Sequence, residues 1–239
     1  QGRKMSKSLG NVVDPIDVIE GISLEDLHAK LYGGNLDPRE IEKAKLGQKE
    51  SYPNGIPQCG TDALRFALCA YTTGGRDINL DILRVDGYRK FCNKIYQATK
   101  FALMRLGDDY VPSATEGLSG KESLVEKWIL HKLTVTSKIV NEALEKRDFL
   151  TSTSEIYAFW YTICDVYIEN SKYLIDQGTP EQQKSAKDTL YILLDNTLKM
   201  IHPFMPFISE EMWQRLPKRS TEKSPETIVK ASYPVYRED

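Results

Sequence analysis

The sequence predicts a mainly α protein in which an antiparallel helix bundle follows a small connector region. Apolar residues recur three and four positions apart from about residue 60 to residue 216, and this spacing is typical of amphipathic helices. Short polar breaks separate these segments, and long helices joined by short loops pack antiparallel. The preceding residues are rich in glycine, proline and aspartate. We therefore expect a connector at 1–60, a helical bundle at 61–216 and a C-terminal strap at 217–239.

Three short helices of the connector are predicted from the residues that begin them. Asp14 precedes Pro15, and proline is well tolerated as the first helical residue because its missing N–H would have no partner there. Ser23 and Asp26 have the spacing of a capping box, which satisfies free N–H groups of the first turn. Asp37 stands in the same position before a proline and a glutamate. These signals predict helices after residues 14, 23 and 37.

Six longer helices are predicted in the bundle. Ser119 and Glu122 form a second capping-box pattern, which we expect to begin the third of them. Pro203 ends the fifth, because proline cannot continue a helix. Residues 227–233 are expected to form a short strand or an extended strap. The predicted helices cover residues 62–72, 84–106, 121–146, 154–175, 181–201 and 208–216.

The composition is that of a folded protein without a membrane segment. Hydrophobic residues make up 41% of the 239 residues, and the formal net charge is −2. No apolar stretch reaches the roughly 18 residues that a membrane helix needs. The four cysteines form no CxxC pair and the three histidines are scattered, so we expect no bound metal and reduced thiols inside the cell. The near-neutral charge neither favours nor excludes nucleic-acid binding, because phosphates respond to a local basic surface.

A lysine-containing loop stands near the N-terminus, flanked by glycines, with the sequence Lys4-Met5-Ser6-Lys7-Ser8. Two lysines three positions apart can place two ammonium groups on flexible stems beside a phosphate. When ATP is attacked at its α-phosphorus, negative charge grows on the leaving pyrophosphate, and cations that meet it in the transition state raise the rate. The alternative is a solvated basic turn without such a role.

The segment KMSKSLGNVVDP resembles the second signature of the class I aminoacyl-tRNA synthetases. Residues 14–31, 60–81 and 87–103 look like the valine branch of this family, and 202–213 is similar to a segment that its subgroup shares. Residues 35–60 resemble the eukaryotic cytosolic form. The resemblance implies ATP-dependent attachment of valine to tRNA(Val), with Mg²⁺ accompanying ATP. It assigns ATP binding to residues 4–8, with Lys4 and Lys7 catalytic.

A basic helix face is predicted within residues 87–107, which contain five lysines and arginines and no acidic residue. Such a stripe can follow an RNA backbone, and Tyr96 or Phe101 could stack on an unpaired base. The simpler alternative is a solvated face of solubilising lysines. The cationic residues are Arg89, Lys90, Lys94, Lys100 and Arg105, and Lys90, Asn93, Lys94, Gln97 and Lys100 fall largely opposite the apolar face.

The family resemblance assigns tRNA contact on this face to Arg89, Phe91, Asn93 and Lys94, because the matching helix of these enzymes helps to bind the anticodon arm. The helical stripe also places Phe91 in the core. We therefore expect the bundle to correspond to the anticodon-binding domain of the synthetases. Elsewhere, Asp62 and Arg65 are expected to anchor the start of their own helix.

The sequence contains no HIGH-type signature, which is the other half of the ATP site in this family. The valine pocket and the editing domain are also expected to lie outside the chain, so the chain alone is expected not to activate valine. Three alternatives remain open: an isoleucyl- or leucyl-tRNA synthetase, a stand-alone RNA-binding module, and a helical bundle that docks other proteins. A cytoplasmic location is expected, and a mitochondrial form is compatible with the sequence.

Overall fold

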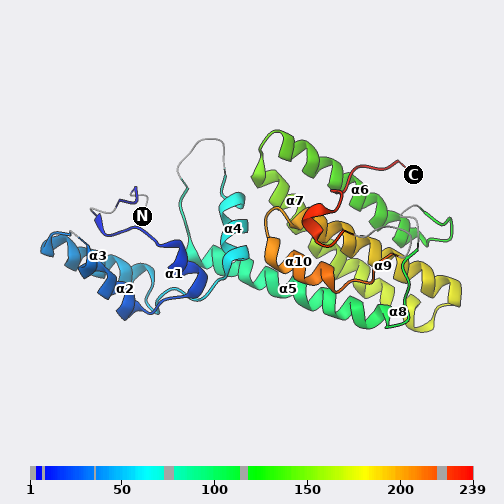
Figure 1. The fold of residues 1–239 in the computed structure, drawn as a ribbon, viewed down its shortest axis with the longest axis horizontal. Coiled ribbons are helices and arrows are strands. Elements are labelled where there is room, and N and C mark those ends of the chain that lie inside the picture. The colour runs from blue at the N-terminus through cyan, green and yellow to red at the C-terminus, as the bar shows by residue number, and fades with distance from the viewer. Residues whose placement is uncertain are drawn as a thin grey trace.

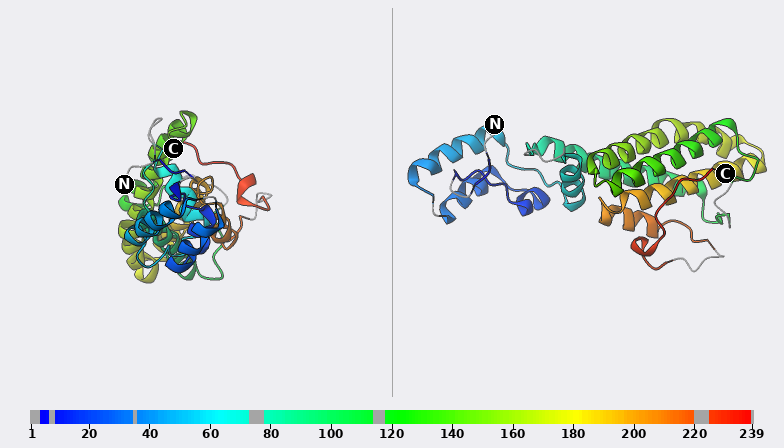
Figure 2. Two further views of the ribbon diagram at one scale, coloured as in Figure 1. Left: turned by 90° about the vertical axis from the view of Figure 1, so that its left-hand side faces the viewer. Right: turned by 90° about the horizontal axis from the view of Figure 1, so that it is seen from above.

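The computed structural model describes residues 4–6, 9–34, 36–72, 78–113, 118–219 and 225–238. The described residues are mainly helical and form no β-strand, so the predicted fold class is confirmed. The molecule is elongated, with α1, α2 and α3 at one end and the bundle at the other, while α4 and the start of α5 lie between them (Figure 1). The view from above shows the same separation (Figure 2). None of the helices in these segments is long and apolar enough to cross a membrane.

The connector helices begin where their caps predict. The side-chain oxygen of Asp14 accepts a hydrogen bond from the Ile16 N–H at 2.9 Å. Ser23 accepts one from the Asp26 N–H at 3.1 Å, and Asp37 accepts one from the third helix in the same way. Each bond satisfies a backbone donor that a helix start leaves free. The elements are α1 (Pro15–Glu20), α2 (Leu24–Lys30), the 3₁₀ turn η2 (Leu31–Gly33) and α3 (Pro38–Ser51).

The loop before the bundle is pinned to the start of α2 by a pair of backbone hydrogen bonds. The Ile22 N–H donates to the Ile56 carbonyl at 2.9 Å, and the Ile56 N–H donates back at 2.8 Å. Gly55 makes this approach possible: its φ is +77°, and a Cβ at that position would overlap the Ile22 carbonyl oxygen. Only glycine combines this backbone angle with the missing side chain. This pairing therefore joins the two ends of the connector segment that contains α2 and α3.

The bundle packs around α9, whose second half is almost wholly buried. The largest buried side chains of the core include Trp160, Tyr167, Ile163, Leu193 and Leu194. Trp160 belongs to one long helical stretch that turns from α-helix to π-helix and back. The bundle elements are α4 (Thr61–Ala70), α5 (Ile82–Leu106), α6 (Leu124–Glu145), α7 (Phe149–Thr162), the π-helix η3 (Ile163–Ile168), α8 (Glu169–Gln177), α9 (Pro180–Ile201), α10 (Pro206–Gln214) and the 3₁₀ turn η4 (Ile228–Lys230).

The start of α6 differs from the prediction. Ser123 and Glu126 form the capping box of this helix, which begins at Leu124. Ser119 and Glu122 also hydrogen-bond to each other, but they form a separate turn ahead of the helix. Two consecutive patterns with the same S-x-x-E spacing stand in this segment, and the sequence prediction chose the first. The helix begins at the second because its glutamate is buried against the bundle.

The pair Asp62 and Arg65 anchors a different helix from the one predicted. Asp62 is buried and accepts hydrogen bonds from the N–H groups of Phe207 (3.3 Å) and Ile208 (2.7 Å), so it caps the start of α10 rather than that of α4. The guanidinium of Arg65 donates to the Pro203 carbonyl at 3.0 Å. Burial raises the pKa of Asp62 despite these bonds. Together the two side chains join α4 to the corner between α9 and α10.

Two apolar cores meet at α4 and α5. The smaller core contains Val18, Leu27 and Ile56 of the connector together with Ile82 and Val85 at the start of α5. The larger core fills the bundle and includes residues further along α5. The side chains of Tyr88 and Cys92 contact both cores, so α5 belongs to connector and bundle alike.

The described part of the C-terminal strap crosses α6 and α9 in extended form, apart from η4. The Tyr233 hydroxyl donates to the Met200 carbonyl at 3.0 Å. The Asn141 amide donates to the Pro234 carbonyl at 2.8 Å, and the Thr134 hydroxyl donates to the Arg237 carbonyl at 3.0 Å. These bonds use side chains to satisfy backbone acceptors that a strand partner would otherwise satisfy.

His202 is expected to make stability fall in mild acid. Its Nδ1 lies 2.8 Å from the Ser209 hydroxyl, and burial lowers its pKa from the ordinary value of 6.5. As pH falls, the unfolded chain therefore takes up this proton first, so stability that is fully present above 6.5 is lost as pH falls toward the folded-state pKa. Urea unfolding at about pH 7.5 and about pH 5.5 should show a larger loss in the wild type than in His202→Gln. Equal losses would contradict this assignment.

Candidate nucleic-acid interface

The described part of the lysine loop is held at its base by Asn11. The Ser6 N–H donates to Asn11 Oδ1 at 2.9 Å, and Asn11 Nδ2 donates to the Lys4 carbonyl at 3.3 Å. The Leu9 N–H donates to the Ser6 carbonyl at 3.1 Å, which turns the chain back. Lys4 and Met5 are exposed, and Ser6 is half-buried. Lys7 and Ser8, which the sequence assigns to ATP, lie outside the described residues. Asn11 thus holds the backbone at Lys4 and Ser6, while Lys4 itself is exposed.

Gly10 seats the loop against the connector helices. Its φ is +61°, and a Cβ there would lie 3.0 Å from Leu36 Cδ1 and 3.2 Å from both Ala44 Cβ and Leu31 Cδ2. The chain therefore passes close over side chains of η2, of α3 and of the link between them. A side chain at this position would be strained and crowded, which ties the direction of the loop to the connector.

Replacing Asn11 is expected to loosen the loop without unfolding the protein. Asn11→Ala removes both side-chain hydrogen bonds that join the two sides of the turn, so amide hydrogen exchange at Ser6 should become faster. Because the site is partly exposed, the free energy of unfolding should fall by no more than about 1 kcal/mol. Asn11→Asp is the matched control, since its carboxylate can still accept from Ser6. Unchanged exchange at Ser6 in Asn11→Ala would show that Asn11 does not hold the loop.

Arg89 lies on the exposed face of α5 beside an acidic residue that precedes the acid-free segment. Its Nε lies 2.7 Å from Asp86 Oδ1, and Lys90 Nζ lies 3.1 Å from the other oxygen of the same carboxylate. The hydrogen bond from Arg89 is the main cause that lowers the pKa of Asp86. Arg89 keeps nearly half of its side chain exposed. Its guanidinium can therefore reach an anion while Asp86 sets its direction.

Lys94 is positioned by the π-helix η3. Its ammonium lies 3.0 Å from Asp165 Oδ1 and 3.6 Å from the centre of the Tyr161 ring. At the far end of α5, Arg105 forms an ion pair with Asp176 of α8. The acid-free segment of α5 is thus partly neutralised by carboxylates that lie 71 residues further along the chain in both cases. The charge count of α5 alone overstates its positive field.

Phe91 does not reach the surface. Only 1% of the residue is exposed, and its ring centre lies 4.7 Å from that of Tyr157 and 5.5 Å from that of Phe66. The helical stripe in the sequence already indicated this position. A fully buried ring cannot contact a bound RNA, so we do not carry Phe91 into the proposed tRNA contact.

Several exposed residues of α5 lie between Arg89 and Arg105, the first and the last of its cations that form ion pairs. Asn93, Gln97 and Lys100 are exposed, and Tyr96 is 38% exposed. We name Arg89, Asn93, Lys94, Tyr96, Gln97 and Lys100 together the α5 surface. Lys100 has no ion pair within the described segments. The surface offers cations, amides and one aromatic ring, which are the groups that contact phosphates and unpaired bases.

Comparison with known proteins matches both ends of the chain to one enzyme class. Residues 1–81 match the family model described as tRNA synthetases class I (I, L, M and V). Residues 126–239 match the model described as the anticodon-binding domain of tRNA ligase. The whole of α5 falls between the two matched spans. The chain belongs to the class I aminoacyl-tRNA synthetases.

The relatives within this class are valine–tRNA ligases. The mitochondrial valine–tRNA ligase of Saccharomyces cerevisiae is 86% identical over 236 residues, which cover 99% of this chain and 21% of the relative. The Schizosaccharomyces pombe enzyme is 67% identical over 100% of this chain and 24% of the relative. The human enzyme is 53% identical over 95% of this chain and 18% of the relative. The chain therefore spans about a fifth of the length of the curated relatives it matches.

A solved structure supports the fold alone. The leucyl enzyme in the LeuRS–tRNA–LeuAMS ternary complex of Agrobacterium radiobacter matches with a TM-score of 0.62 at 20% sequence identity. The match covers 99% of this chain and 22% of that chain. Connector and bundle are therefore arranged as in a class I synthetase.

Proposed function

We propose that this chain is the part of a valine–tRNA ligase that supplies the KMSKS loop to the ATP site and a surface for the anticodon arm of tRNA(Val). The observation that carries the proposal is the 86% identity to a valine–tRNA ligase over 99% of the chain. The 236 aligned residues take in nearly the whole chain, so they include both the connector and the bundle. It favours the valine branch over the isoleucine and leucine branches, which the sequence alone left open.

The proposed role of the loop is to stabilise charge during formation of valyl-adenylate. The valine carboxylate attacks the α-phosphorus of ATP, the bond to the β,γ-pyrophosphate breaks, and negative charge gathers on the leaving group. Lys4 and Lys7 would meet this charge, and Met5, Ser6 and Ser8 would line the nucleotide with them. Mg²⁺ would accompany ATP as part of the substrate. The exposed Lys4 ammonium on a backbone fixed by Asn11 supports this role, since a preorganised cation stabilises the transition state without reorganising at that moment.

The proposed role of α5 is to hold the anticodon arm through Arg89, Asn93 and Lys94. Arg89 and Lys94 are each directed by a carboxylate, and Asn93 is exposed beside them. The guanidinium and ammonium would contact phosphates, and the amide can pair with a base edge. The remaining residues of the α5 surface would extend the contact along the helix.

Two measurements test the proposal. The chain is titrated with unfractionated tRNA, and the retained species are sequenced. We expect enrichment of tRNA(Val) and weaker binding when its anticodon bases are replaced. Affinity that does not depend on the anticodon would instead favour a stand-alone RNA-binding module.

In ATP–pyrophosphate exchange, we expect no valine-dependent turnover by this chain alone, because it lacks a HIGH-type signature. Turnover would show that the chain holds a complete ATP site.

The proposed location is the cytoplasm, with a mitochondrial form allowed. The connector stretch at residues 35–60 resembles the cytosolic eukaryotic form. The Saccharomyces relative is named as mitochondrial, while the Schizosaccharomyces and human relatives carry no compartment in their names. Both compartments use the same reaction, so the location does not alter the roles proposed for the loop and for α5.

A further inference from the structure

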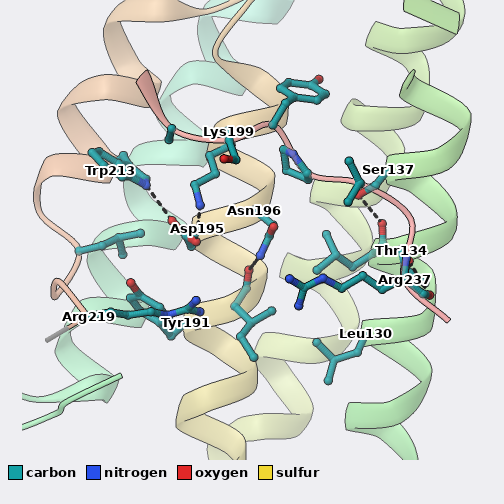
Figure 3. A pocket seen from close by; sticks show the side chains of 18 of the residues that line it. Leu130, Thr134, Ser137, Tyr191, Asp195, Asn196, Lys199, Trp213, Arg219 and Arg237 are labelled. Atoms are coloured by element: carbon teal, nitrogen blue, oxygen red, sulfur yellow. Dashed lines mark hydrogen bonds and ion pairs between the residues drawn. The ribbon is translucent and has the colours of Figure 1, made fainter. Parts of the chain in front are cut away.

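A wide groove lies on the bundle between α6, α9, α10 and the C-terminal strap (Figure 3). Its volume is about 1170 Å³, and no residue of α5 lines it. Figure 3 shows Arg219 and Arg237 entering from opposite sides, with Asp195 and Asn196 of α9 along the floor. We call it the strap groove. It is therefore a surface separate from the α5 surface described above.

The strap groove carries a strong excess of positive charge. Among the residues that the structure describes, two carboxylates, Asp195 and Glu238, line it together with six cationic side chains, so the formal balance of these is six minus two, or +4. The whole chain has a net charge of −2. A local excess of this size attracts anions even when the total charge is slightly negative. The cationic side chains are Lys127, Lys199, Lys218, Arg219, Lys230 and Arg237.

The acidic residue at the floor is already occupied by protein partners. Asp195 Oδ2 lies 2.8 Å from Lys199 Nζ, and Oδ1 accepts a hydrogen bond from Trp213 Nε1 at 2.7 Å, as Figure 3 shows. Asp195 is also buried, with 5% of the residue exposed. Its charge is thus matched by Lys199 and does not cancel the other cations.

Two lysines of the groove have no carboxylate partner in the described segments. Lys127 is exposed on α6 and forms no ion pair there. Lys218 lies 3.5 Å above the centre of the Trp213 ring and donates to the Trp213 carbonyl at 3.4 Å. Asp195 and Glu210 attract its charge from beyond ion-pair distance, and no described carboxylate forms an ion pair with it. Burial lowers the pKa of Lys218, so its charged form would gain from a nearby anion. Both ammonium groups are available to a ligand.

We propose that the strap groove binds the sugar-phosphate backbone of tRNA as a second contact, independent of the α5 surface. The groove is larger than the roughly 300 to 1,000 Å³ of small-molecule pockets, which favours a polymer with repeated anions over a single phosphate. Of its tyrosines and tryptophan, Tyr191 and Trp213 are buried, and the half-buried Tyr233 is held by its hydrogen bond to the Met200 carbonyl, so the groove offers mainly cations. Nearly all of its lining lies within the span that matches the anticodon-binding model, and the inference rests on the proposed tRNA ligase function.

The test measures how tRNA binding depends on salt. Fluorescence anisotropy with the 239-residue chain and unfractionated tRNA is recorded between about 50 and 200 mM KCl. Each phosphate contact contributes about 0.7 to 0.9 to the slope of log affinity against log salt. Lys127→Ala/Lys218→Ala should therefore lower the slope by about 1.5 and the affinity about tenfold at low salt. The control is Lys49→Ala/Lys146→Ala, which removes two exposed lysines outside the groove and should change neither value.

A second variant distinguishes a change in the charge of the groove from a loss of folding. Lys218 packs on Trp213, whereas Lys127 is exposed and unpaired, so Lys127→Glu changes the charge of the groove with little effect on packing. It should weaken tRNA binding and leave the thermal unfolding midpoint unchanged. An unchanged salt slope in folded Lys127→Glu and in the double variant would overturn the inference.

The outcomes separate this inference from the proposed function. If Arg89→Ala/Lys94→Ala weakens binding and the groove variants do not, the α5 contact stands and the groove inference fails. If only the groove variants weaken binding, the groove stands and the α5 assignment fails. Additive losses in the four-site variant support both. Competition by polyglutamate as effective as that by tRNA would mark an acidic-protein site and overturn the assignment to RNA.

Discussion

Reversing the charges of Arg89 and Lys94 together should weaken tRNA binding by about a hundredfold at low salt. Each cation is expected to contribute on the order of 1 to 2 kcal/mol through contact with phosphate or base, and two such losses multiply in the equilibrium constant. Both side chains belong to α5, and each is directed by a carboxylate. The measurement is a titration of Arg89→Glu/Lys94→Glu with unfractionated tRNA. The control Lys49→Glu/Lys146→Glu changes the net charge equally at two other exposed positions.

A charge swap distinguishes RNA contact from a role in folding. Lys94→Glu/Asp165→Lys keeps an ion pair between α5 and η3 but moves the cation to the other helix. If Lys94 matters only through this pair, the swap should restore both stability and tRNA binding. If Lys94 contacts RNA, the swap should restore stability and leave binding weak. Full recovery of binding would remove Lys94 from the proposed site.

Replacing Trp160 by alanine should lower the free energy of unfolding by about 3 to 5 kcal/mol. The residue has no exposed surface and lies at the centre of the bundle, so truncation removes a large buried apolar area and leaves a cavity. Its indole N–H has no hydrogen-bond partner in the described structure, so the loss comes from packing alone. Urea unfolding of the chain at neutral pH measures the effect.

Trp160→Phe is the matched control for this prediction. Phenylalanine keeps most of the apolar contact and removes the unpartnered N–H, so the loss should be less than half that of alanine. A loss below about 1 kcal/mol for Trp160→Ala would mean that the core around this residue is not tightly packed.

The fold could be predicted from sequence because its main signals are local. The spacing of apolar residues marked the helices of the bundle, and Asp14, Ser23 and Asp37 marked the starts of the connector helices. The start of α6 was misplaced because two capping patterns of the same spacing follow each other directly there. Local pattern alone does not say which glutamate is buried, since burial is decided by packing against α9.

The candidate sites were harder to predict because their partners are distant in the sequence. Asp62 satisfies N–H groups 145 and 146 residues away, and Lys94 pairs with Asp165 across 71 residues. No periodicity within one helix carries that information. Phe91 was ambiguous because two signals disagreed. The helical pattern placed it in the core, and the family resemblance assigned it to tRNA contact. The strap groove involves four separate elements and left no signal in any one of them.

The helix α5 contributes side chains to both apolar cores, and this arrangement bears on where the chain can be divided. A cut at the boundary between residues 60 and 61 would leave the connector without Ile82 and Val85. It would also expose the first turns of α4 and α5, which the connector covers. The connector piece would lose its interior, whereas the bundle piece would keep the larger core and expose its part of the smaller one. The connector and the bundle should therefore melt in a single cooperative transition, and limited proteolysis should not release a stable connector.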